Sequence, residues 1–251
     1  TKVEVRFRGG VETVEGGDAS YFGNAMFNLP LGDTLALRAS GFYNKRGGWI
    51  DSIGTTATDA FGYTLTADKA DNVNGSESYG GRASLLFKPS DAFDLRLTAI
   101  AQNIRAERIQ FKGTDQGIRI KSNSDRGPDV SHLFFKDITM EGVKTAILIS
   151  EYYPSVEPPA DNRPQPIGRL TPFFHDFHIE NVTATGAGVS AVVFGLPESP
   201  VKDLTMKNVH LSGVKGMTIS DAQGVVLEDV KVTAEQGKAI DIRPSAKVTI
   251  H

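Results

Sequence analysis

The chain has 251 residues, of which 39% are hydrophobic and 23% charged, a composition typical of a folded protein. Lysine and arginine number 27 against 30 for aspartate and glutamate, so no basic excess predicts a nucleic-acid partner. The absence of cysteine excludes disulfides and thiolate metal sites. No apolar run of about 18 residues occurs, which excludes a transmembrane helix but not alternating membrane strands. The chain begins Thr1-Lys2 without a signal peptide or initiator methionine, so we expect it to start inside a longer protein or to be processed.

Residues 1–106 show the two-residue period of β-strands. Apolar and polar residues alternate over 35–43 and again over 93–99, where Arg38 and Arg96 mark the polar side. Turns containing Pro, Gly and Asp separate these runs, which predicts antiparallel hairpins. The stretch 45–78 is rich in Gly, Asp, Asn, Ser and Thr, so we expect a mobile loop there. Alternation alone fits a soluble antiparallel sheet as well as a membrane sheet.

The sequence motifs of residues 1–106 are more specific for a protein family than the alternation of apolar and polar residues. Asn28-Leu-Pro-Leu-Gly-Asp-Thr-Leu-Ala-Leu-Arg38 and Asn74-Gly-Ser-Glu-Ser-Tyr-Gly-Gly-Arg-Ala-Ser84 are two of several phrases that resemble the barrel of TonB-dependent receptors, over roughly residues 10–105. The resemblance implies energised uptake of a bulky nutrient and outer-membrane association of residues 1–106. We expect only about four strands, against about 22 in a complete barrel of that family. So few strands leave unpaired edges and cannot form a pore.

Residues 107–251 follow a different, repeating pattern. Each repeat has an Asp or Asn followed by Ile or Val, and then a short apolar strand. The acid or amide positions are Asp137, Asn181, Asn208 and Asp229. Short β-branched strands with Gly turns, repeating every roughly 20–30 residues outside one insertion, predict a solenoid. The leucine-rich-repeat frame does not fit, so we predict a right-handed parallel β-helix.

The predicted fold is therefore all-β, with antiparallel β-hairpins of outer-membrane-barrel type in residues 1–106 and a right-handed parallel β-helix in residues 107–251. No Pro/Gly/Ser-rich linker lies at the join between Ile104 and Ile109. The abrupt join favours a chimera whose two parts have no joint function.

Residues 107–251 also contain motifs that resemble those of a known family. Gly117-Ile-Arg-Ile-Lys121, Asp125-Arg-Gly127, Phe135-Lys-Asp-Ile-Thr-Met140 and Ala146-Ile-Leu-Ile-Ser-Glu-Tyr-Tyr153 resemble the C-terminal coils of the polygalacturonases of glycoside hydrolase family 28. The resemblance implies a pectin-class substrate, and a location in the bacterial cell envelope (periplasm or outer membrane) or outside the cell.

Arg119 and Lys121 lie two residues apart, so both side chains project from one face of a strand. Two cations on one face suit an acidic sugar, although without the resemblance a solvated basic strand is the simpler interpretation. The resemblance implies that Arg119, Lys121 and Tyr153 bind polygalacturonate or a related uronate oligosaccharide. Tyr152 is the alternative to Tyr153.

Glycoside hydrolysis needs one carboxyl group as general acid and another to activate water. The Asn-Thr-Asp, Asp-Asp and Gly-His-Gly motifs that supply these groups in the family do not occur in this chain, and Asp115 and Asp125 fit turns. No histidine pairs with a nucleophile or has metal-ligand spacing; the five are His132, His175, His178, His210 and His251. We therefore predict no catalytic residue, no metal and no cofactor, and negligible pectin hydrolysis by the chain alone.

Overall fold

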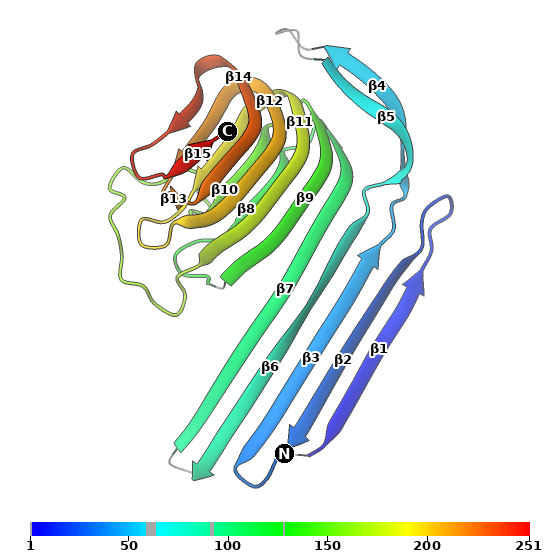
Figure 1. Cartoon of the computed structure of the whole chain (residues 1–251), viewed down its shortest axis with the longest axis vertical. Helices are drawn as coiled ribbons and strands as arrows, with labels where there is room; N and C mark the ends of the chain where they lie inside the picture. The colour runs from blue at the N-terminus through cyan, green and yellow to red at the C-terminus, as the bar shows by residue number, and fades with distance from the viewer. Residues whose placement is uncertain (1, 59–63, 91–92, 128) are drawn as a thin grey trace.

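The structure is a computed structural model that describes all residues except 1, 59–63, 91–92 and 128. The described part of the chain is all-β (Figure 1). It includes no helix, and therefore no helix able to cross a membrane. The strands before the repeat region are β1 (Glu4–Glu12), β2 (Ser20–Pro30), β3 (Leu35–Arg46), β4 (Ile50–Thr58), β5 (Thr64–Val73), β6 (Ser76–Ser90) and β7 (Phe93–Lys112). Those that follow are β8 (Gln116–Lys121), β9 (Asp129–Glu141), β10 (Thr145–Ser150), β11 (Phe173–Phe194), β12 (Val201–Ser220), β13 (Ala222–Gln223), β14 (Val225–Ile242) and β15 (Val248–Ile250).

The N-terminal part is an antiparallel sheet in the order β1-β2-β3-β6-β7. The antiparallel hairpins predicted for residues 1–106 are thus confirmed, but two expectations are wrong. Seven strands begin in this part rather than about four. The expected loop at 45–78 contains the β4–β5 hairpin, in which Thr56 pairs with Thr66 and Thr58 with Thr64, because Thr is common in strands as well as in polar loops.

Beyond residue 106 every strand pairing among the described residues is parallel. One row of strands runs β7-β9-β11-β12-β14-β15, and a second joins β8 and β10 to the C-terminal ends of β11, β12 and β14. Successive coils therefore place equivalent residues side by side. The right-handed sense of the coil stays a prediction.

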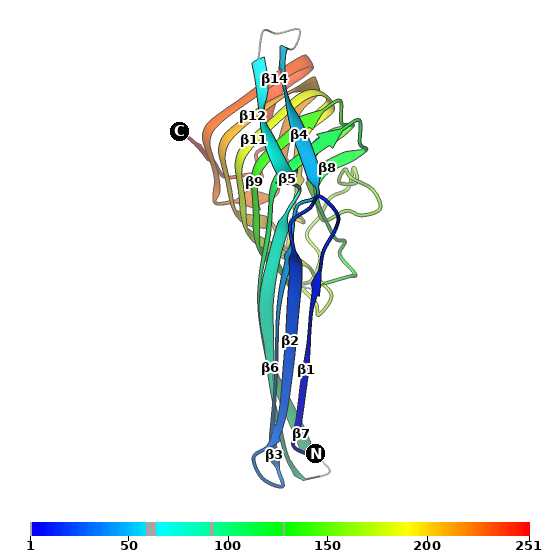
Figure 2. The same cartoon turned by 90° about the vertical axis from the view of Figure 1, so that its right-hand side faces the viewer.

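The antiparallel and parallel parts share strand β7. Its residues up to Ala106 pair antiparallel with β6, and those from Ile104 pair parallel with β9, so the two ladders overlap. Figure 2 shows the antiparallel strands as a thin layer that continues away from the coils. The predicted boundary near residue 106 lies inside this strand, which joins the parts without a linker.

Columns of left-handed backbone residues form the corners of the coils. The first column aligns across five strands, has φ between 49° and 56°, and consists of Arg108, Asp137, Asn181, Asn208 and Asp229. A second, with φ between 52° and 68°, consists of His132, Asp176, Asp203 and Gly224. A third consists of Gly113, Gly142 and Gly186. Left-handed backbone is strained for most residues but tolerated by Gly, Asn and Asp, which explains the Asp/Asn period of the sequence.

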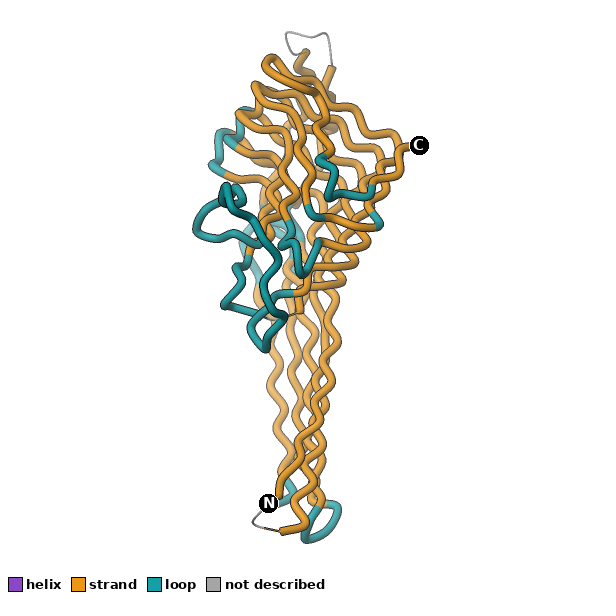
Figure 3. Tube along the Cα trace, turned by 90° about the vertical axis from the view of Figure 1, so that its left-hand side faces the viewer, coloured by secondary structure: helices purple, strands orange, loops and turns teal. Residues whose placement is uncertain are grey.

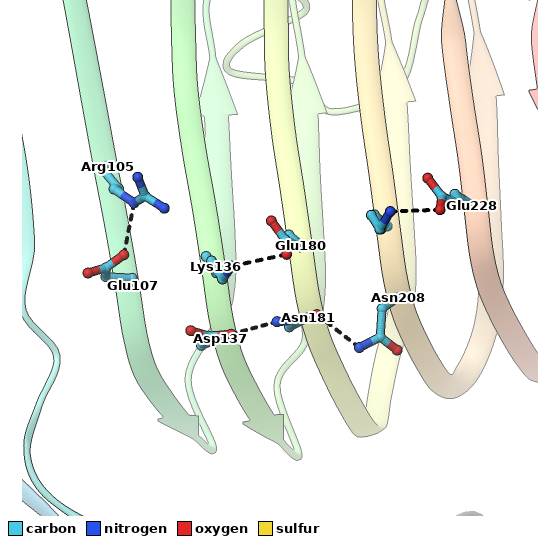
Figure 4. Close-up of polar contacts among 9 residues, drawn as sticks. Arg105, Glu107, Lys136, Asp137, Glu180, Asn181, Asn208 and Glu228 are labelled. Atoms are coloured by element: carbon cyan, nitrogen blue, oxygen red, sulfur yellow. Dashed lines mark hydrogen bonds and ion pairs between the residues drawn. The ribbon is translucent and has the colours of Figure 1, made fainter.

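Side-chain hydrogen bonds link the first column from coil to coil (Figure 4). The Asn181 amide Nδ2 donates to Asp137 Oδ1 at 2.8 Å, and Asn208 Nδ2 donates to Asn181 Oδ1 at 2.9 Å. One residue earlier on each strand, Lys136 pairs with Glu180 at 3.0 Å and Lys207 with Glu228 at 2.7 Å (Figure 4). These exposed ion pairs contribute little each, whereas the amide ladder fixes the register of the corner.

The hydrophobic core lies inside the coils. Its largest fully buried side chains include Phe174, Phe177, Met206 and Ile219. Among the described residues before 107, only Ala36 and Val73 are buried hydrophobics. The antiparallel sheet therefore has no core of its own.

The two faces of the antiparallel sheet differ sharply in polarity. One face carries exposed apolar side chains from β1, β2, β6 and β7, including Phe7 at 78% and Leu97 at 58% exposure, while Leu35 and Leu37 of β3 are half-buried on the same face. The opposite face carries arginines, among them Arg6 and Arg82, which lie in one cross-strand row. The arginine face continues along β7 into the side that faces the coil core, where Ala106 aligns with Phe135. The face that is charged in the antiparallel sheet thus becomes the apolar, core-facing side of the strands in the coils.

The amide ladder yields a stability prediction. We expect Asn181→Ala to lower the free energy of unfolding by about 1–3 kcal/mol, because it removes two hydrogen bonds and places a Cβ residue without a polar side chain in the left-handed region. Asn181→Gly removes the same hydrogen bonds, but Gly adopts the left-handed conformation without strain. We therefore expect its free energy of unfolding to fall by about 1 kcal/mol less than that of Asn181→Ala. Urea denaturation of both variants measures the difference. Equal losses in the two variants would contradict a corner strained at this residue.

Candidate functional site

Strand β8 presents Arg119 and Lys121 on its outer face. Ile118 and Ile120 alternate with them and are buried in the core, at 3% and 6% exposure, while both cationic side chains are exposed. Parallel pairing with β10 places Arg119 beside Leu148 and Lys121 beside Ser150. The predicted projection from one strand face is confirmed.

Three cations surround the ring of Tyr153. The Lys121 Nζ atom lies 3.6 Å from the ring centroid, the Arg126 Cζ atom 5.1 Å and the Arg119 Cζ atom 5.8 Å. These distances are within the range of cation–π attraction. The structure thus brings together all three residues predicted from the sequence and adds Arg126. Its place in the Asp125-Arg-Gly127 turn directly after β8 is the sequence signal that points to it.

Hydrogen bonds to backbone carbonyl groups hold this arrangement. The Tyr153 amide donates to the Ser122 carbonyl at 2.9 Å, and the buried Ser122 hydroxyl donates to the Gly127 carbonyl at 3.1 Å. The Gly127 amide in turn donates to the Leu170 carbonyl. The turn that carries Arg126 and the segment 151–172 that carries Tyr153 are therefore fixed to the end of β8. Figure 3 shows the long loops gathered on one side of the coils.

Tyr152, the alternative site tyrosine, has a different environment. Its hydroxyl lies 2.9 Å from Asn162 Oδ1 and 3.0 Å from the Gly195 carbonyl oxygen, and its ring packs against the buried cluster of Leu148, Val192 and Phe194. Burial raises the pKa of Tyr152 to about 12. Tyr152 fastens the segment 151–172 to the coils, whereas Tyr153 is the tyrosine that contacts the cations.

Glu151 is a fully buried acid beneath this segment. The Leu196 amide donates to its Oε2 at 2.9 Å, while its Oε1 has no hydrogen-bond partner. Burial raises the pKa of Glu151 to about 8; the Leu196 hydrogen bond opposes this rise and the charge of Glu198 adds to it. Glu151 is therefore largely protonated at neutral pH.

The other acids near β8 are engaged or exposed. Asp115 forms an ion pair with Lys144 at 2.6 Å, and Lys144 lowers the pKa of the Asp115 carboxyl. Asp125 is exposed in its turn. Histidines lie beside acids on the coil surface, with His178 Nε2 2.8 Å from Asp176 Oδ1. In the part of the chain that the structure describes, no three such side chains converge as a metal-binding group.

Parallel strands stacked coil upon coil, with polar side chains on the outer face, are the arrangement of β-helical repeat proteins. Residues 96–226 match the family described as glycosyl hydrolases family 28, whose members are parallel β-helices. The chain belongs to this family. The match begins ahead of residue 106, within β7.

A curated relative also matches part of the chain. Over 129 residues the chain is 28% identical to a protein of Vitis vinifera described as "Probable polygalacturonase". The matched stretch is 49% of this chain but 25% of the grapevine protein, so the chain spans about a quarter of that relative's length. No solved structure matches the chain.

Glu151 makes stability depend on pH. The unfolded state releases its proton near pH 4.5 and the folded state only near pH 8, so the folded state binds more protons between these values. Stability is therefore expected to fall as pH rises through this window, by up to about 1.4 kcal/mol per pH unit from this group. Glu151→Gln keeps an acceptor for Leu196 but does not titrate. We expect its advantage over the unsubstituted protein to grow from pH 4.5 to pH 8 in urea denaturation. Parallel pH profiles for the two proteins would contradict the raised pKa.

Proposed function

We propose that the coil part of the chain binds an acidic, pectin-class oligosaccharide such as oligogalacturonate, with Arg119, Lys121 and Tyr153 as contacts. The observation that carries the proposal is the convergence of three cations on the ring of Tyr153. Membership of glycosyl hydrolases family 28 and the similarity to a protein described as a polygalacturonase support the substrate class.

The physical basis is the local charge. Asp115 lies near Arg119 but forms its ion pair with Lys144, and none of the three cations around Tyr153 forms an ion pair within 4.0 Å among the described residues. A uronate carboxylate supplies the missing counter-charge, and charge-assisted hydrogen bonds to it are stronger than neutral ones. Arg126 adds a third cation to the same site, which favours a ligand with more than one anionic group.

We further propose that this chain alone binds the sugar without cleaving it. Inverting hydrolysis requires two carboxyl groups about 6.5–9.5 Å apart on opposite sides of the bond. Asp115 is held by Lys144, and Glu151 is buried with Oε2 toward the Leu196 amide. Neither is free to activate water above the cations. Catalytic motifs of the family are absent from the sequence, which supports the same conclusion.

Calorimetric titration with oligogalacturonate tests the binding proposal. We expect Arg119→Ala and Lys121→Ala each to weaken binding by about tenfold or more, since a hydrogen bond to a charged group contributes about 1.5–3 kcal/mol. Binding should also weaken as salt rises. Lys207→Ala, which removes a cation from another part of the coil surface, is the matched control and should bind normally. Unchanged binding in both site variants refutes the sugar site, and release of new reducing ends from polygalacturonate refutes the absence of cleavage.

The apolar face of the antiparallel sheet favours a second candidate function, attachment to a lipid bilayer. Exposed apolar side chains cover this face, and the tyrosines Tyr21, Tyr43 and Tyr79 lie together near one end of it. From Tyr43 to Leu35 along β3 the apolar band is about 27 Å long at about 3.4 Å per residue, close to the apolar height of outer-membrane proteins. Tyrosine is common at the membrane interface. The resemblance to TonB-dependent receptors and a location in the bacterial envelope belong to this proposal, and a chimera without joint function is its alternative.

Vesicle flotation tests the membrane proposal. We expect the full chain to float with phosphatidylcholine–phosphatidylglycerol vesicles, and Leu97→Asn on the apolar face to reduce the bound fraction at least several-fold, because a polar amide would enter hydrocarbon. Ser40→Asn on the opposite face is the matched control and should float like the unsubstituted protein. A chain that stays monomeric in buffer without detergent and never floats would contradict lipid attachment.

A further inference from the structure

A pocket lies on the same outer surface of the coils as Arg119 and Lys121, but toward the C-terminal coils. Its cavity volume is about 640 Å³, within the range of small-ligand sites. Strands β11, β12 and β14 form its floor, and Val156 and Glu157 of the segment 151–172 border it. Tyr152 and Val156 pack on Leu148 and Phe194, so covered apolar side chains lie between this pocket and the Tyr153 site.

The charge of the pocket is positive in excess. Its lining includes the cations Lys215, Lys238 and Arg243 and the acids Glu157 and Asp241. Lys238 forms an ion pair with Asp241 at 2.7 Å, so these two charges compensate each other. Lys215 and Arg243 form no ion pair within 4.0 Å among the described residues, and the Arg243 guanidinium stands 5.3 Å from the centroid of the Phe194 ring.

The two unpaired cations lie at opposite ends of the pocket floor. Thr218 of β12 aligns with Asp241 of β14, Lys215 precedes Thr218 by three residues, and Arg243 follows Asp241 by two. At about 3.3 Å per residue, the backbone positions of Lys215 and Arg243 are roughly 16 Å apart along the strands. Thr145, Thr218 and Gln236 line the pocket and supply hydrogen-bonding groups.

We propose that this pocket is a second binding site for an acidic oligosaccharide with at least two carboxylates, one held by Lys215 and the other by Arg243. The inference rests on the proposed function for its ligand class and adds an independent site. A single uronate reaches only one of the cations, so it binds weakly. A long polyuronate that occupies this pocket and the Tyr153 site together gains affinity from both.

Calorimetric titration of the full chain with trigalacturonate and with galacturonate tests the proposal. We expect two trigalacturonate sites per chain, and one of the two weakened by about tenfold or more in Arg119→Ala, Lys215→Ala or Arg243→Ala. In the Arg119→Ala background, where the second site is the tighter one, Lys215→Ala should weaken its trigalacturonate binding by about tenfold or more, and galacturonate should bind far more weakly than trigalacturonate. Lys231→Ala, an exposed coil-surface cation outside the pocket, is the matched control with unchanged binding.

A variant that is expected to strengthen binding separates an effect on the site from a loss of folding. Asp241→Asn removes a negative charge and frees Lys238, so trigalacturonate binding in the Arg119→Ala background should strengthen severalfold. One site that is lost entirely in Arg119→Ala, or affinity indifferent to Lys215, Arg243 and Asp241, overturns the second site while leaving the proposed function intact. Binding that Arg119→Ala and Lys121→Ala leave unchanged but Lys215→Ala abolishes refutes the Tyr153 site and supports the second one.

Discussion

The coils depend on a backbone constraint, which is that each must turn at the same residue as its neighbours. Parallel strands stay in register only if their corners coincide, and a single left-handed residue makes a corner of fixed length. Asp and Asn tolerate this conformation and can also bond to the next coil, as Asn181 does to Asp137 and Asn208. The corner column therefore fixes which side chains enter the core and which, like Arg119, remain outside.

The antiparallel sheet and the coils differ in which side of their strands is charged and which is apolar. In the coils the outer side of the strands is charged, as the pairs of Lys136 with Glu180 and Lys207 with Glu228 show. On the same side of the antiparallel part, Phe7 and Leu97 are exposed. No single environment suits both surfaces, because the apolar face of the antiparallel sheet favours an apolar neighbour and the charged outer face of the coils favours water. The proposals of lipid attachment and of a chimeric origin both follow from this mismatch.

Local chemistry made parts of the fold predictable. The alternation around Arg119 and Lys121 and the recurrence of residues such as Asn181 follow from short-range sterics, and the structure has both. The contact of Arg126 with Tyr153 depends on a turn and a long insertion folding onto each other, which no local pattern encodes. The β4–β5 hairpin is not predictable from composition, because Thr-rich strands that also contain Asp resemble a polar loop. Resemblance, rather than periodicity, identified Tyr153.

Continuity of β7 governs how the proposed sugar site is oriented. The strand runs unbroken from the antiparallel sheet into the first coil, and only residues 113–115 separate it from β8 and Arg119. A flexible tether would let the coils pivot freely over any surface to which the sheet adheres. Here β7 pairs with β6 of the sheet and with β9 of the coils, so the ladder carries the orientation of the sheet into the first coil. Attachment of the antiparallel sheet to a surface would therefore fix the orientation of the coils. A polysaccharide chain would then have to approach β8 from one direction.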